Sequence, residues 1–146
     1  MKILEISPQD QMDLFIQTKK RKISPRTQNQ KDYFHLLNSK DIVFAYGPAG
    51  TGKTFLAVAK AVASLQQGLV KKNVLTRPTG EAGGKISFLP GDPKGKVDSF
   101  FRPIYDALFE KIPYDQVEKK LTNNIIEIAT ISFYGRRTLG GWFIYF

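Results

Sequence analysis

Short apolar runs alternate with helix-like segments along this chain. Residues 42–45 form a continuous apolar run, which is typical of a strand buried on both faces. Residues 55–65 follow with alanine, leucine and valine at helical spacing, and a second short strand is expected at 74–76. Right-handed crossover geometry would place that second strand parallel to the first. The pattern predicts a β-α-β unit within an α/β fold, with a mostly parallel sheet flanked by helices.

The remaining segments extend this pattern. Thr27 is the expected N-cap of a helix over residues 26–37, whose apolar face contains Tyr33 and Phe34. His35 beside that face is interpreted as a partly buried helix residue rather than a metal ligand or catalytic group, because no cysteine or second histidine accompanies it. Helices are also expected over residues 97–111 and 117–121, a strand over 125–131 and a buried strand over 142–146. A long glycine-rich loop is expected over 79–96.

One segment between the first predicted strand and the following helix carries candidate chemistry. It fills all four fixed positions of the phosphate-binding pattern G-x-x-x-x-G-K-[ST] at a strand-to-helix junction. The alternative is a glycine-rich turn followed by an accidental Gly-Lys-Thr, but the strand-helix context favours a nucleotide site. The predicted cofactor-binding residues of this loop are Gly47, Pro48, Ala49, Gly50, Thr51, Gly52, Lys53 and Thr54.

Each part of such a loop has a physical role toward a nucleotide. Its glycines let backbone N–H groups turn toward phosphate oxygens, and the positive end of the following helix favours negative charge. Lys53 would reach the β- and γ-phosphates, and the Thr54 hydroxyl would bind Mg²⁺. The loop therefore predicts ATP and Mg²⁺ as ligands.

Composition restricts the class of protein further. A chain of 146 residues fits one domain, and the absence of cysteine excludes disulfides and thiolate sites, which suits a reducing cytoplasm. No apolar stretch approaches membrane-spanning length, so a soluble, cytoplasmic protein without a membrane partner is expected. The net charge of +9 favours polyanionic partners. Residues 1–25, which include the basic cluster 19–22, are interpreted as an N-terminal arm before a domain over 26–146, and this cluster either contacts a phosphate backbone or is solvated.

Five short segments after the phosphate loop carry a family resemblance. They read Thr-Arg-Pro at 76–78, Glu-Ala-Gly at 81–83, Phe-Leu-Pro-Gly-Asp at 88–92, Lys-Val-Asp at 96–98 and Arg-Pro-Ile-Tyr-Asp-Ala-Leu at 102–108. In this order they resemble the PhoH family of phosphate-starvation-inducible ATP-binding proteins, over roughly residues 25–139. The resemblance implies a fold like the ATPase core of superfamily 1 helicases, and a family ATPase activity. It also implies that Gln30 contacts adenine; the alternative is a surface helix residue.

The chain departs from the family pattern in several places. Gly84 and Gly95 stand where acidic residues are usual, and the segment 133–139 has a glycine and an arginine exchanged. In the family, the strand matching residues 143–146 leads into an Asp-Glu-Ala-Gln segment that supports Mg²⁺ and activates water. The resemblance therefore implies a partial domain, truncated before that segment, which binds ATP but turns it over negligibly. Asp92, Asp98 and Asp106 are interpreted as caps, turns or surface residues rather than substitute catalytic acids.

Two further expectations concern partners. RNA or single-stranded DNA is a candidate partner, with Phe100, Phe101, Tyr105 and Phe109 as stacking residues, although their helical spacing favours core packing. Arg77, Arg136 and Arg137 either contact phosphates or are solvated. The alternative function is a non-catalytic nucleotide-binding fragment or a basic nucleic-acid-binding fragment. The family resemblance allows an oligomer, and the strand at 142–146 is expected to flank a gap in the sheet that invites self-association.

Overall fold

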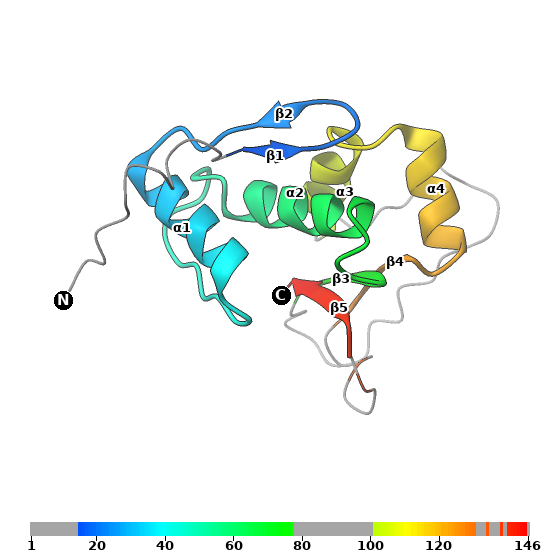
Figure 1. The fold of residues 1–146 in the computed structure, drawn as a ribbon. Helices are drawn as coiled ribbons and strands as arrows, with labels where there is room; N and C mark the ends of the chain where they lie inside the picture. The colour runs from blue at the N-terminus through cyan, green and yellow to red at the C-terminus, as the bar shows by residue number, and fades with distance from the viewer. Residues whose placement is uncertain (1–14, 78–100, 131–133, 135–137, 139, 146) are drawn as a thin grey trace.

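The computed structural model describes residues 15–77, 101–130, 134, 138 and 140–145. These residues form an α/β fold in which α2 lies between an N-terminal hairpin and a parallel sheet (Figure 1). The elements in chain order are β1 (Ile16–Gln17), β2 (Lys22–Ile23), α1 (Gln28–Ser39), α2 (Lys53–Gln66), β3 (Lys72–Arg77), α3 (Arg102–Phe109), α4 (Tyr114–Thr122), β4 (Ile126–Thr130) and β5 (Trp142–Tyr145).

The sheet has three strands in the order β4-β3-β5, and both neighbours of β3 run parallel to it. Leu75 of β3 stands opposite Ile128 on one side and Tyr145 on the other. Val74 and Leu75 are completely buried, as expected for the central strand of a parallel sheet. The predicted α/β class with a parallel sheet and flanking helices is confirmed for the described residues, while the likeness to a helicase ATPase core stays a prediction.

The helices were predicted largely correctly because their sequences carry local signals. Thr27 caps α1 as expected, accepting a hydrogen bond from the backbone N–H of Gln30 at 3.2 Å. The predicted helices over residues 55–65 and 117–121 correspond to α2 and α4. The helix predicted over 97–111 is described from residue 101 on. There it corresponds to α3, which has Pro103 in its first turn and ends at Phe109.

The main hydrophobic core lies where α2 and α3 meet the sheet. Val58 and Val62 of α2 pack there with Ile104 and Leu108 of α3, and all four are completely buried. Phe101 belongs to the same core, so it is a packing residue and not a stacking platform for nucleic acid. The other members of this core are Leu75, Tyr105, Ala107, Ile112, Val117, Ile126 and Ile128, with Phe109 half-buried against them.

The strand predicted over residues 42–45 is absent, which corrects the expected β-α-β unit. The segment joins no sheet in the described part of the chain, and Ile42, Phe44 and Tyr46 are 76%, 90% and 98% exposed. A strand needs a neighbour to accept its backbone hydrogen bonds, and an apolar run alone does not provide one. β3 instead pairs with β4 and β5, which follow it in the chain.

The last strand was also predicted to be buried, but all four residues of β5 are only half-buried. Among the described strands, β5 pairs with β3 alone and forms one edge of the sheet. Its edge position explains the exposure, because an edge strand lacks a second neighbour.

The exposed apolar side chains of Ile42, Phe44 and Tyr46 are expected to promote self-association. Replacing Phe44 and Tyr46 together by serine is expected to lower the apparent mass of the chain at high concentration, because two large apolar side chains then leave the surface. Sedimentation velocity over a concentration series measures this. Leu69→Ser is the matched control, since Leu69 is also exposed but lies after α2. A wild-type chain that stays monomeric throughout the series contradicts the prediction.

Part of the segment predicted to be an arm packs against the domain. Ile16 of β1 and Ile23 of β2 stand opposite each other and are buried against α1 and α2. The Lys19 ammonium donates to Gln116 Oε1 at 2.7 Å, Lys20 donates to the carbonyl of Phe109 at 2.6 Å, and Arg21 forms an ion pair with Glu110. Three side chains of the basic cluster therefore contact the end of α3, the residue after it and the start of α4. The boundary at residue 25 itself stays a prediction.

Candidate nucleotide-binding site

The predicted phosphate loop runs directly into α2, which begins at Lys53. Gly52 is the N-cap of this helix with φ of +91°, and Gly50 has φ of +78°. Glycine adopts this left-handed backbone conformation at low cost. A Cβ atom on Gly52 would also lie 3.1 Å from Gln30 Nε2. The backbone turn therefore favours glycine at both positions, and a side chain at position 52 would also displace the Gln30 amide slightly.

The Lys53 ammonium lies over the loop that precedes it. Its Nζ donates to the carbonyl oxygens of Gly47 at 2.9 Å and Pro48 at 2.6 Å, and to Thr51 Oγ1 at 3.2 Å. All three partners are neutral oxygens. A charged phosphate is a stronger acceptor for an ammonium than a neutral carbonyl, so these contacts can be exchanged for a phosphate at little cost.

Thr54, the next residue, contacts the sheet. Its Oγ1 lies 2.7 Å from the phenolic oxygen of Tyr145, and either hydroxyl can be the donor. This hydrogen bond connects the first turn of α2 to the end of β5 across 91 positions of sequence. Tyr145 was not predicted as a site residue, because residues 142–146 show only the pattern of an apolar strand. No local signal pairs a strand tyrosine with a threonine so distant.

Gln30 reaches the loop from the first turn of α1. Its Oε1 accepts from the backbone N–H of Arg26 at 2.7 Å, and its Nε2 donates to the carbonyl of Thr51 at 3.0 Å. The structure thus brings Gln30 to the phosphate loop, where its side chain connects the loop to the segment before α1 by hydrogen bonds. An amide group has a second N–H and a further acceptor lone pair beyond these two contacts. Its role toward adenine stays a prediction.

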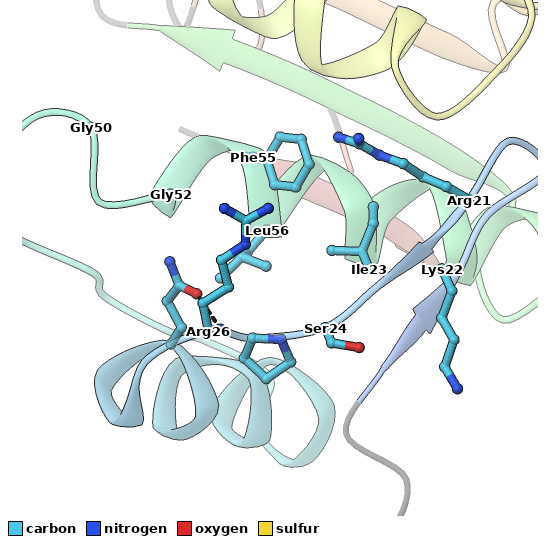
Figure 2. Close-up of a pocket in the computed structure, with 11 residues that line it drawn as sticks. Arg21, Lys22, Ile23, Ser24, Arg26, Gly50, Gly52, Phe55 and Leu56 are labelled. Carbon is cyan, nitrogen blue, oxygen red and sulfur yellow. Dashed lines mark hydrogen bonds between the residues drawn. The ribbon is translucent and has the colours of Figure 1, made fainter.

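A cavity of about 570 Å³ adjoins Gln30 and the loop. Its walls come from the N-terminal hairpin and the segment after it, from the start of α1, from the phosphate loop and from the start of α2 (Figure 2). The volume lies in the range of small-molecule sites. Apolar and cationic side chains share the lining, which consists of Arg21, Lys22, Ile23, Ser24, Pro25, Arg26, Gln30, Gly50, Gly52, Phe55 and Leu56.

Phe55 forms one wall of this cavity and is contacted by two cations. The guanidinium carbon of Arg21 lies 5.3 Å from the ring centroid, and the ammonium of Lys111 lies 3.5 Å from it. Lys111 is completely buried and donates to the carbonyl of Ala107 at 2.8 Å. Burial lowers the pKa of Lys111 to about 8, with Glu110 opposing the shift and Arg21 adding to it. Lys111 was not predicted as a site residue, because the sequence places it only at the end of a predicted helix.

Other predicted site residues are not brought to the loop or lie outside the described residues. Asp106 is exposed on α3, as its interpretation as a surface residue requires. His35 does lie in helix α1, but it is exposed there rather than partly buried. The loop over 79–96, with Gly84, Asp92 and Gly95, lies outside the described residues, as do Asp98, Phe100, Arg136, Arg137 and the side chain of Arg77. Within the described ranges there is no group of three or more His, Cys, Asp or Glu residues able to hold a metal ion. The helices that are described include none long and apolar enough to cross a membrane.

Comparison with known proteins decides the family. The PhoH family model, described as PhoH-like protein, matches residues 22–146. The chain belongs to the PhoH family. A PhoH-like protein from Bacillus subtilis is 48% identical over 121 residues, which cover 83% of this chain and 38% of the relative. The family resemblance inferred from the short motifs is therefore confirmed, and the match begins inside the segment predicted to be an arm.

Two other relatives are similar over comparable lengths. A PhoH-like protein from Mycobacterium tuberculosis strain H37Rv is 43% identical over 139 residues, which cover 94% of this chain and 40% of the relative. Protein PhoH of Escherichia coli K12 is 36% identical over 118 residues, which cover 80% of this chain and 33% of the relative. The chain thus spans between a third and two-fifths of the length of these curated relatives.

Proposed function

We propose that this chain binds Mg-ATP at the loop over residues 47–54. The observation that carries the proposal is the complete loop at the start of α2, with the Lys53 ammonium folded over loop oxygens. The phosphates would lie on the backbone N–H groups of the loop and at the positive end of α2, whose first turn contains no acidic residue. Lys53 would bind the β- and γ-phosphates.

The residues present fit a magnesium nucleotide. Mg²⁺ prefers oxygen ligands and keeps several waters and phosphate oxygens, so one protein hydroxyl is a usual contribution. Thr54 provides that hydroxyl next to Lys53. When bound, Mg²⁺ would neutralise part of the phosphate charge.

The cavity beside Gln30 supports a place for the base. It adjoins Gly50 and Gly52 of the phosphate loop, and Phe55 and Leu56 supply an apolar wall for a flat aromatic ring. The remaining N–H and lone pair of Gln30 suit the edge of adenine, which offers both a donor and an acceptor. We therefore place the adenine in this cavity as part of the proposal.

Base selection by Gln30 has a direct test. Gln30→Ala is expected to reduce the preference for ATP over GTP about three- to tenfold, the usual net worth of a hydrogen bond. Competition of both nucleotides against a fluorescent ATP analogue measures the preference. Gln28→Ala is the matched control, because Gln28 lies in the same helix turn but bonds to Asp32. An unchanged preference in Gln30→Ala removes the adenine assignment.

ATP hydrolysis, a role in phosphate starvation, action on RNA or single-stranded DNA, and oligomer formation are proposals for the whole family protein. The contacts of Lys19, Lys20 and Arg21 within the domain favour a nucleotide over a nucleic acid as the first ligand of the described part. Parallel titration with a fluorescent ATP analogue and with single-stranded RNA, with phosphate release measured in the same samples, separates the alternatives. RNA binding without Lys53-dependent ATP binding would contradict the proposed function and support a nucleic-acid-binding fragment instead.

A further inference from the structure

The hydroxyl pair of Thr54 and Tyr145 is a feature of the site that phosphate binding alone does not explain. The two oxygens are 2.7 Å apart and partly buried. The backbone of Tyr145 is fixed by parallel pairing with Leu75 of β3, and its side chain packs against the main core. Tyr145 is therefore a rigidly placed partner for the first turn of α2.

A threonine hydroxyl that binds a metal ion still needs a hydrogen-bond acceptor for its O–H group, and Tyr145 can provide one. A neutral threonine hydroxyl has one proton and two lone pairs, so when a lone pair binds Mg²⁺ the proton needs an acceptor elsewhere. A phenolic oxygen can accept a hydrogen bond from that O–H group. Rotation about χ1 would otherwise allow the hydroxyl to turn toward a backbone carbonyl of the loop that precedes α2.

We propose that Tyr145 is a positioning residue for magnesium. Its phenolic oxygen accepts a hydrogen bond from the Thr54 O–H group and holds the Thr54 hydroxyl in the orientation that leaves a lone pair for the metal. This inference rests on the proposed Mg-ATP function and adds to it a residue from β5. Tyr145 does not touch the nucleotide in this arrangement; it acts through Thr54.

A structural tether between α2 and β5 is the alternative role for the same hydrogen bond. A tether would change stability and would affect nucleotide binding equally with and without Mg²⁺. A positioning residue changes the magnesium dependence of binding specifically. The ratio of ATP affinity in Mg²⁺ to ATP affinity in EDTA therefore separates the two roles. A partial loss of folded protein does not change this ratio, because both affinities are measured on the same preparation.

The test compares wild type and Tyr145→Phe on the full chain with a fluorescent ATP analogue. The phenylalanine keeps the ring packing and removes only the hydroxyl. We expect the magnesium enhancement of affinity to fall about three- to tenfold, corresponding to one neutral hydrogen bond. Affinity in EDTA should stay the same. Tyr33→Phe is the matched control, because Tyr33 is a tyrosine near Tyr145 but lies on α1, outside the loop.

A second variant tests whether the effect passes through Thr54. In a Thr54→Val background, Tyr145→Phe should have no further effect on the magnesium enhancement, as a double-mutant cycle requires for a residue acting through its partner. An unchanged enhancement in Tyr145→Phe overturns the inference, as does an equal loss in Mg²⁺ and in EDTA. Failure of the proposed function gives a different result, because wild type and Lys53→Ala would then bind the analogue equally.

Discussion

Lys53→Ala is expected to weaken binding of Mg-ATP about a hundredfold. The Lys53 ammonium donates three hydrogen bonds to the loop, and phosphate oxygens would take over at least two of them as charge-assisted bonds. Each such bond contributes about 1.5–3 kcal/mol, so losing two accounts for a hundredfold loss or more. Titration with a fluorescent ATP analogue in Mg²⁺ measures the change.

Lys60→Ala is the matched control for this experiment. Lys60 lies two turns further along α2, and its ammonium donates to Asn38 Oδ1 of α1 at 2.7 Å, away from the loop. Its removal deletes the same charge from the same helix and should leave ATP affinity unchanged within about twofold, since a charge so far from the phosphates is largely screened. Equal affinities of wild type and Lys53→Ala would show that the loop is not the phosphate site.

Lys111→Met is expected to stabilise the folded chain at pH 7 by about 1–3 kcal/mol. Lys111 is completely buried between Phe55 and the Ala107 carbonyl, and burial lowers its pKa from 10.5 to about 8. At pH 7 the folded chain must hold a charge that water would solvate better, which costs about 1.4 kcal/mol for each pH unit of the shift. Methionine keeps the length and the aromatic contact, while the lost hydrogen bond and cation–π contact offset part of the gain.

The lowered pKa of Lys111 determines how the stability of the wild-type chain changes with pH. Between pH 8 and pH 10.5 the unfolded chain holds the Lys111 proton more tightly than the folded chain, so wild-type stability rises with pH across that window. The advantage of Lys111→Met should therefore be largest below pH 8 and shrink toward pH 10. Urea unfolding of both proteins at pH 7, 8, 9 and about 9.5 measures the difference.

Two controls isolate Lys111 from other titrating groups. Burial raises the pKa values of Tyr33 and Tyr105 from 10.0 to about 12. The stability that these two tyrosines contribute is therefore lost only as pH rises above 10. This loss is the same in wild type and Lys111→Met, so it cancels in the comparison. Lys119→Met replaces an exposed lysine of α4 and should change stability by no more than about 0.5 kcal/mol. A Lys111→Met protein that is less stable than wild type at every pH would show that the cation–π contact outweighs the burial of the charge.

Local signals in the sequence determined much of the fold and the phosphate loop. Thr27 supplies a capping oxygen within its own turn, and helical spacing of alanine, leucine and valine suffices for α2. The loop before Lys53 was predictable for the same reason, because Gly50 and Gly52 are needed by the backbone conformation at their own positions. The family followed from short motifs that are local as well.

Only the tertiary structure decided the features that depend on distant partners. Residues 42–45 have the composition of a strand, but strand formation requires a neighbour for the backbone, and the described residues provide none. The contacts of Thr54 with Tyr145, of Gln30 with Thr51 and of Phe55 with Lys111 join positions far apart in the chain. Such pairs arise from the packing of α1, α2, α3 and β5 against one another, and a sequence pattern of period two or 3.6 carries no information about them.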